Sequence, residues 1–224
     1  MKGVFQSRPA LPRYQVTWDT SIVLEHLKTY PAVEDLTLQQ LTHKLVMLCA
    51  LVTGQRAQSL HLMNLLTVKK EEDSYTFYID QLVKQSGPSR VQPTLVIPKF
   101  PADHRLCVAS VMEEYIKRTA LIRGQENQLF LSTIRPFHKV SKSSISRWIK
   151  VVMQAAGIDI ETLKPHSTRA AATSKAKQCD VSINSILKAE SWKTDCVFHR
   201  FYNKNVVSQR GDAEFGNAFL SASQ

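Results

Sequence analysis

The sequence predicts a mainly α-helical protein with one small antiparallel β-sheet inserted, an α+β fold, on three observations. Apolar residues recur with helical spacing along most of the 224-residue chain. One stretch, residues 75–97, changes to short aromatic and β-branched runs around a turn-rich segment, which is typical of a hairpin or a three-stranded sheet. Hydrophobic residues make up 43% of the chain, enough for the core of one large domain, with or without an arm.

The chain is expected to begin with an arm followed by a short helix. Residues 1–16 contain two prolines and several basic residues, so they predict an extended basic arm, because proline disfavours helix at and before its own position. The side chain of Asp19 or Thr20 can cap a helix that continues through Leu27.

Two further helices and the sheet are expected next. A strongly apolar helix is predicted over 38–52, and Gly54 interrupts it. A third helix is expected to start near Arg56 and to continue to residue 65. The sheet is formed by the strands 75–79 and 94–97, which flank the turn-rich segment.

The second half of the chain is predicted to be helical. Ser141 or Ser143 can cap a helix that ends near Gly157. Residues 213–220 in the tail can form a short amphipathic helix. The other expected elements are a helix over 105–121, a short strand over 129–131, and helices over 167–179, 182–189 and 194–202.

The charge balance points to a polyanionic partner. Lys and Arg number 29 against 19 Asp and Glu, a net charge of +10, which makes nucleic acid the first candidate and a basic surface that serves solubility the alternative.

The four cysteines are far apart and form no CxxC pair, so neither a zinc site nor a disulfide framework is expected. This cysteine usage predicts a reducing compartment. No metal, cofactor, small-molecule substrate or membrane partner is expected. We expect a nuclear protein, or a cytosolic one if the source is prokaryotic.

Six polar residues spread over the chain have the chemistry of a phosphate-handling site. Arginines, a histidine, a lysine and a tyrosine can together bind a phosphodiester and attack it without a metal. The six are Arg56, Lys84, His166, Arg169, Trp192 and Tyr202.

Taken singly, each of the six has an ordinary structural explanation. His166 and Arg169 are three positions apart near a helix start, which puts them on one face, but solvated polar residues occur there too. Arg56 follows a glycine turn that can direct it into a cleft, although a surface arginine is as common. Lys84, in a turn, can be merely solvated. Trp192 and Tyr202 can be packing residues with a satisfied polar atom.

In their order and spacing, the six residues together resemble those of a known family, the tyrosine recombinases (phage integrase-like enzymes). The resemblance covers about residues 20–205. The first motif is Thr-Gly-Gln-Arg56, and the central one is His166-Ser-Thr-Arg169. Lys84 follows Arg56 by 84 − 56 = 28 residues, and Trp192 follows Arg169 by 192 − 169 = 23 residues. The wording around these motifs is most similar to recombinases of eukaryotic Crypton or DIRS-like mobile elements. The chain departs from the family in having Ser59 where many members have an acidic residue, and in a Tyr202 one residue farther from the tryptophan.

The resemblance implies the tyrosine recombinase catalytic-domain fold and site-specific DNA strand exchange. Tyr202 is then the nucleophile that forms a 3′-phosphotyrosyl bond, with no need for metal or ATP. Arg56 and Arg169 stabilise the phosphoryl oxygens, and Lys84 protonates the leaving 5′-oxygen. His166 takes the tyrosine proton or hydrogen-bonds the phosphate, and Trp192 donates a hydrogen bond and packs.

The resemblance also implies a domain plan and partners. Residues 1–16 are the linker from an N-terminal DNA-clamping domain that is not recognisable here, 17–205 are the catalytic domain, and 206–224 are a tail whose helix docks in cis or in trans. The partners are double-stranded DNA and further copies of the chain, which form a tetramer on DNA. Basic residues that can contact the DNA backbone are Lys142, Arg147, Lys150 and Lys175.

Two other functions remain open at this point. A domesticated or inactive recombinase that binds DNA without catalysis is the chief alternative. The retention of all six positions argues against it, and the departures at Ser59 and Tyr202 leave room for it. The other is nicking and resealing of one duplex, as by a type IB topoisomerase. A helical interaction protein without a nucleic-acid role requires the joint spacing to be accidental.

Overall fold

A computed structural model describes residues 16–83, 92–189, 198–199 and 202–207. The helices are α2 (Thr20–Lys28), α3 (Leu38–Thr53), α4 (Ala57–His61), α5 (Val108–Thr119), α6 (Lys142–Ala155), α7 (Ser167–Gln178) and α8 (Ile183–Ala189), with 3₁₀ turns η1 (Val33–Asp35) and η2 (Leu65–Thr67). The strands are β1 (Val16–Trp18), β2 (Val68–Lys70), β3 (Ser74–Tyr78), β4 (Thr94–Pro98) and β5 (Asn205–Val207). The mainly helical α+β architecture predicted from the sequence is therefore confirmed.

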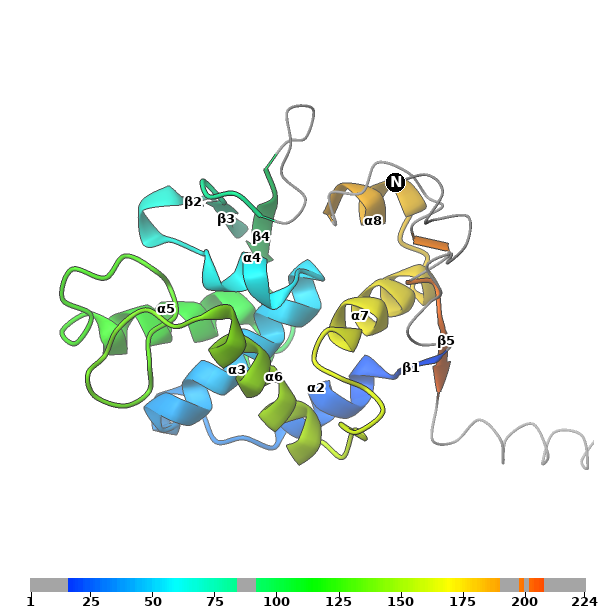
Figure 1. Ribbon diagram of the computed structural model, residues 1–224, viewed down its shortest axis with the longest axis horizontal. Coiled ribbons are helices and arrows are strands. Elements are labelled where there is room, and N and C mark those ends of the chain that lie inside the picture. Colours follow the sequence, from blue (N-terminus) through cyan, green and yellow to red (C-terminus); the bar gives the residue numbers. More distant parts are fainter. Residues whose placement is uncertain (1–15, 84–91, 190–197, 200–201, 208–224) are drawn as a thin grey trace, which may run out of the picture.

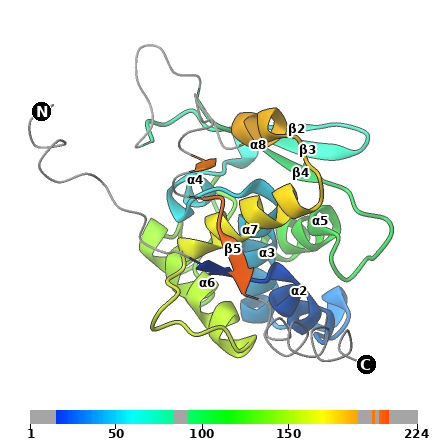
Figure 2. The same cartoon turned by 90° about the vertical axis from the view of Figure 1, so that its right-hand side faces the viewer.

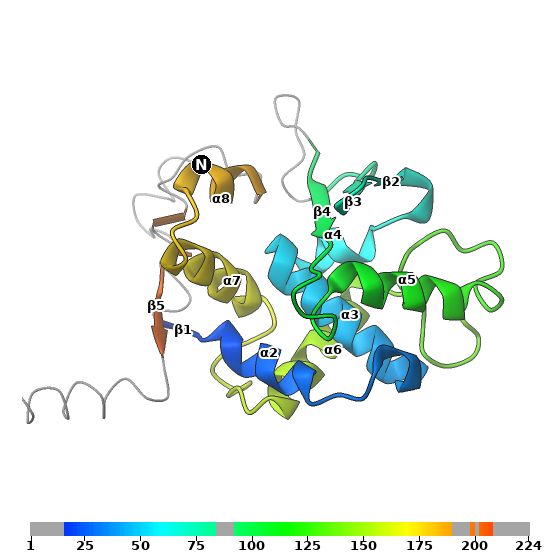
Figure 3. The same ribbon diagram turned by 180° about the vertical axis from the view of Figure 1, so that it is seen from behind.

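Helix α3 is the centre of the molecule, with α5, α6 and α7 packed around it (Figures 1 and 3). Every residue from 41 to 50 is buried, the polar Thr42, His43 and Lys44 included, so this part of the helix is enclosed on all sides. A capping box fixes its start, because the Thr37 hydroxyl accepts from the backbone N–H of Gln40 while the Gln40 side chain accepts from that of Thr37. Within the described part of the chain, no helix combines the length and the apolar character that a bilayer span requires.

The antiparallel sheet has the strand order β2-β3-β4 and lies against α3 and α5. The alternation of β4 explains its orientation, since Leu95 and Ile97 are buried while Thr94, Val96 and Pro98 are exposed. Their partners across the ladder, Phe77 and Tyr75, are buried on the same face. The three-stranded alternative of the sequence prediction is the one observed, with β2 as the third strand.

A second, two-stranded sheet was not predicted. Strand β1 pairs in parallel with β5, so that Val16 faces Asn205 and Trp18 faces Val207, and both strands lie beside α7 (Figure 2). The indole N–H of buried Trp18 donates to the Ser167 hydroxyl at 2.9 Å. The pairing joins segments from the two ends of the described chain.

Capping residues mark several helix ends where the sequence predicted them. The Asp19 carboxylate accepts from the Ser21 N–H at 3.0 Å, and the Ser141 hydroxyl accepts from the Ser144 N–H at 3.3 Å. Gly54 and Gly157 end α3 and α6 with positive φ angles of 60° and 85°.

Three predicted elements need correction. The third helix ends at His61 rather than near residue 65, because the following backbone pairs with a distant segment: the Leu129 N–H donates to the Met63 carbonyl at 2.7 Å. The segment 129–131 forms no strand, only an isolated bridge between Leu131 and Lys139. Helix α5 starts at Val108 rather than at 105. The predicted elements over 1–15, 194–197 and 213–220 lie outside the described residues.

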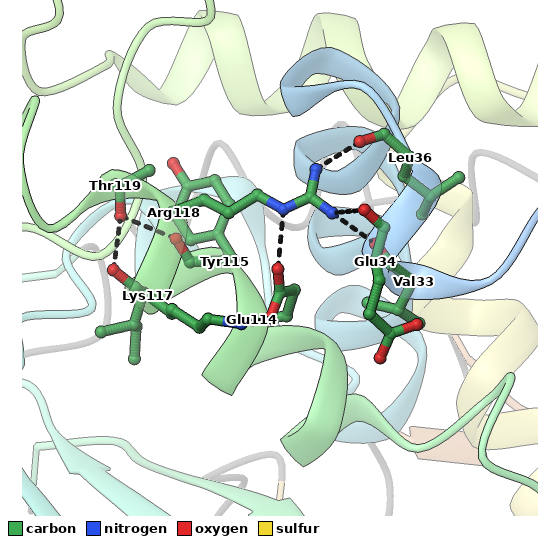
Figure 4. A network of polar contacts seen from close by, with 9 residues as sticks. Val33, Glu34, Leu36, Glu114, Tyr115, Lys117, Arg118 and Thr119 are labelled. Atoms are coloured by element: carbon green, nitrogen blue, oxygen red, sulfur yellow. Dashed lines mark hydrogen bonds and ion pairs between the residues drawn. The ribbon is translucent and has the colours of Figure 1, made fainter.

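Arg118 on α5 secures the segment that leads into α3 (Figure 4). Its guanidinium donates to three backbone carbonyls and one carboxylate: those of Val33, Glu34, Leu36 and Glu114. One half-buried guanidinium therefore satisfies several acceptors of η1 and its surroundings, which fixes α5 against the start of α3.

Candidate active site

Arg56 stands at the break between α3 and α4. Gly54 has φ 60° and ψ 9°, a left-handed conformation that favours glycine, and it turns the chain sharply at the end of α3. Arg56 then adopts an extended backbone directly before α4. Its side chain is half-buried, and its Nη2 donates a hydrogen bond to the phenolic oxygen of Tyr202 at 3.3 Å.

His166 and Arg169 lie at the start of α7 and line the same cleft. His166 is the exposed residue immediately before the helix, whereas Arg169, one turn later, is only 2% exposed. The Arg169 Cζ lies 5.4 Å from the centroid of the Tyr202 ring, a cation–π distance. The buried guanidinium is therefore held beside the tyrosine, while the imidazole is at the mouth of the cleft.

Tyr202 is held by backbone contacts on both sides. Its N–H donates to the carbonyl of Phe198 at 2.8 Å, and the Phe198 side chain is fully buried. Its own carbonyl accepts from the Ser174 hydroxyl of α7 at 2.7 Å. The half-buried phenol thus reaches Arg56 from a backbone tied to the helix that carries Arg169.

A cleft of about 400 Å³ lies along these residues. Its lining comes from the starts of α4, α6 and α7: Gln55, Arg56, Ala57, Gln58, Lys142, Ser143, Ser146, Ile149, Pro165, His166, Thr168 and Arg169. The lining of the cleft includes two arginines, a lysine and a histidine, and no acidic residue is among these described residues. The N-terminal ends of α6 and α7 border the cleft, so the positive ends of their helix dipoles lie beside it. The cleft is suited to an anion.

Gln55, which the sequence analysis did not single out, connects the site to α8 and is held by Ser59. The Gln55 side chain donates from Nε2 to the carbonyl of Ala189 at 2.9 Å and accepts at Oε1 from the Ser59 hydroxyl at 3.1 Å. Ser59, the position where many recombinases carry an acid, thus forms a neutral contact that orients Gln55 next to Arg56. The spacing of four residues on a helix start is the sequence signal that could have paired them.

The predicted DNA-contacting residues occupy different environments. Lys142 lines the cleft, and Arg147 and Lys150 continue along α6. Lys175 instead lies 3.5 Å from the Asp19 carboxylate. Burial alone raises the pKa of Asp19, but hydrogen bonds from Ser21 and the nearby Lys175 ammonium bring that pKa below its usual value.

Lys84 and Trp192 lie outside the described residues. The structure therefore brings together four of the six predicted residues. Two guanidinium groups beside a phenol form an arrangement that can hold the oxygens of a phosphodiester while the phenol attacks its phosphorus.

No protein-family model matches this sequence, and no curated protein does. Solved structures do resemble it. XerH site-specific recombinase bound to difH substrate superposes with a TM-score of 0.63 at 13% identity, covering 92% of this chain and 53% of the XerH chain. XerA recombinase gives a TM-score of 0.59 at 14% identity, covering 96% of this chain and 67% of XerA.

A lambda integrase dimer (residues 75–356) bound to a COC′ core site gives a TM-score of 0.53 at 18% identity, with 94% of this chain and 66% of that chain covered. At these identities the likeness is one of fold. The chain spans about half the length of the XerH protein that it resembles.

Proposed function

We propose, from the fold that this chain shares with tyrosine recombinase catalytic domains, that it carries out site-specific DNA strand exchange or integration. The observation that carries the proposal is the position of the Tyr202 phenol, hydrogen-bonded to Arg56 and beside Arg169 next to a cationic cleft. The proposed nucleophile and the two proposed phosphate-binding groups come from distant parts of the chain and lie next to one another.

The proposed reaction is a transesterification. The Tyr202 oxygen attacks a backbone phosphorus, an O–P bond to the 3′-phosphate forms, the bond to the 5′-oxygen breaks, and a proton passes to that oxygen. A 5′-hydroxyl of another strand reverses the step, so the phosphodiester energy is conserved and neither ATP nor a metal is required.

The charged residues have separate roles in this proposal. Arg56 and Arg169 bind the non-bridging oxygens, whose negative charge grows in the transition state, and a planar fork suits that task. His166 accepts the tyrosine proton or hydrogen-bonds the phosphate. Lys84 protonates the leaving oxygen and Trp192 donates a hydrogen bond, as their positions in the sequence motifs imply.

We further propose double-stranded DNA and self-assembly as the partners. The XerH structure is a complex with difH substrate, and one lambda integrase structure is a tetramer bound to a Holliday junction, which supports both. The cationic α6 residues Lys142, Arg147 and Lys150, together with Lys175, are proposed to contact the DNA backbone. Residues 1–16 are proposed as a linker from a DNA-clamping domain, and 206–224 as a docking tail. The motif wording supports an origin in a Crypton or DIRS-like element and a nuclear location.

The test is covalent capture on DNA. The chain is incubated, with EDTA present, with nicked suicide duplexes taken from the DNA that flanks its own gene. We expect a protein–DNA adduct that Tyr202→Phe abolishes and that Tyr78→Phe, at an exposed tyrosine of β3, leaves unchanged.

The outcomes separate the alternatives. Salt-sensitive binding without an adduct on any of these duplexes contradicts the catalytic proposal and supports a non-catalytic DNA-binding protein. An adduct that only reseals its own duplex and never joins a second strand contradicts strand exchange and supports a topoisomerase-like reaction.

A further inference from the structure

Ser174 holds the backbone from Tyr202 to Lys204. It lies on α7, beyond Arg169 on the same helix, and is 3% exposed. Its hydroxyl donates to the Tyr202 carbonyl at 2.7 Å and accepts from the Lys204 N–H at 3.0 Å. A serine hydroxyl has one donor and can accept as well, so both capacities are used on this short segment.

The two bonds complete a set of anchors around the tyrosine. Upstream, the Tyr202 and Asn203 N–H groups both donate to the Phe198 carbonyl at 2.8 Å. Downstream, β5 is paired with β1. Ser174 lies between these anchors and connects the tyrosine backbone to α7 itself, the helix on which Arg169 is buried.

We propose that Ser174 is a positioning residue that sets the distance between the Tyr202 phenol and the two arginines. The proposal rests on the proposed function of Tyr202 as nucleophile. The phenol reaches Arg56 with a hydrogen bond of 3.3 Å and has the Arg169 Cζ 5.4 Å from its ring centroid. A displacement of about 1 Å at a reacting group can cost about 10²-fold in rate, so a small backbone shift has a large effect.

A purely structural role makes different predictions. If Ser174 serves only as a satisfied buried hydroxyl, its loss lowers the unfolding temperature and affects DNA binding and cleavage through the folded fraction alone. A positioning role lowers the cleavage rate at saturating DNA while the dissociation constant stays the same.

The experiment compares Ser174→Ala and Ser174→Thr with wild type in single-turnover cleavage of the nicked duplexes. We expect S174A to form adduct about 10²-fold more slowly at saturating DNA, with an unchanged dissociation constant. S174T keeps the hydroxyl and should recover part of the rate. Ser110→Ala, which removes a serine hydroxyl that contacts Cys107 on α5, is the matched control.

A second readout needs no DNA. The Lys204 amide donates to Ser174, so its hydrogen exchange should accelerate in S174A and not in S110A. If S174A forms the adduct as fast as wild type does, the proposed role of Ser174 is wrong. Unchanged hydrogen exchange at Lys204 in S174A would also overturn it. A wild type that forms no adduct overturns the proposed function instead.

Discussion

The guanidinium of Arg56 donates a hydrogen bond of 3.3 Å to the phenol of Tyr202, although 146 positions separate the two residues. A single chain therefore brings the phenol of Tyr202 to Arg56, which lines the cleft. In the proposed reaction, the arginine that binds the phosphate and the tyrosine that attacks it therefore need not come from different copies.

This relationship predicts that cleavage occurs within one chain. An equal mixture of Tyr202→Phe and Arg56→Ala proteins should form no adduct on nicked DNA, because neither chain has both groups. The measurement is adduct yield relative to wild type diluted to the same active-site concentration. Recovery of adduct in the mixture would show that the tyrosine of one copy enters the cleft of another.

Arg56→Lys should slow adduct formation by about 10²–10³-fold, the usual cost of losing one preorganised donor. The ammonium keeps the charge but lacks the planar fork that can bind a phosphate and the phenol together. Arg105→Lys is the control, since Arg105 is exposed and paired with Asp103. If both variants form adduct at equal rates, Arg56 has no role in the chemistry.

Gln55→Glu should loosen the end of α8. The carboxylate can still accept from Ser59, but it cannot donate to the Ala189 carbonyl, and the loss of one such hydrogen bond costs about 0.5–1.5 kcal/mol. Hydrogen exchange across Ile183–Ala189 should therefore accelerate. Ser59→Ala keeps the bond to Ala189 and should leave that exchange slow, and similar exchange in both variants would argue against the tether.

Arg118→Leu should lower the free energy of unfolding by about 1.5–3 kcal/mol, because several carbonyls around η1 lose a charged donor. Urea denaturation measures this loss. Lys117→Met, which removes an exposed ion pair with Glu114, should cost less than about 1 kcal/mol. Cleavage per folded molecule should not change, since Arg118 is not among the residues that line the cleft.

His43 should make stability depend on pH. Burial lowers the pKa of this histidine, which is 8% exposed on α3 and packs against Trp148, and its Nε2 atom has no hydrogen-bond partner among the described residues. Below about pH 6.5 the unfolded chain binds a proton that the folded chain resists, so the free energy of unfolding should fall as the pH drops.

Denaturation of His43→Leu across pH 5–7 tests this. The substitution should flatten the dependence, whereas replacing the exposed His104 by Leu should not. If the free energy of unfolding of H43L depends on pH as steeply as that of wild type, other groups cause the pH dependence.

The features that could be predicted from the sequence are those with local causes. Asp19, Ser141 and Gly54 mark helix ends through their own side chain or backbone freedom, and the apolar run of α3 is buried in any arrangement. His166 and Arg169 share a face because they are one helical turn apart.

The features that were missed depend on tertiary contacts. The three-residue strands β1 and β5 have no periodicity long enough to detect, and they exist because each pairs with the other. The end of α4 is set by pairing between Met63 and Leu129. Ser174 carries no signal at all in the sequence, since its two partners become visible only when the chain returns to α7.

The pairing of β1 with β5 also gives the domain a mechanical property. The chain enters at Val16 alongside the strand that begins at Asn205, just past Tyr202. Tension on the incoming segment is therefore borne by the same ladder that anchors the tyrosine backbone from its far side. If Tyr202 attacks DNA as proposed, a pull or a twist applied before Val16 would reach its backbone through the β1–β5 pairing, and the entry strand would act on the position of the nucleophile.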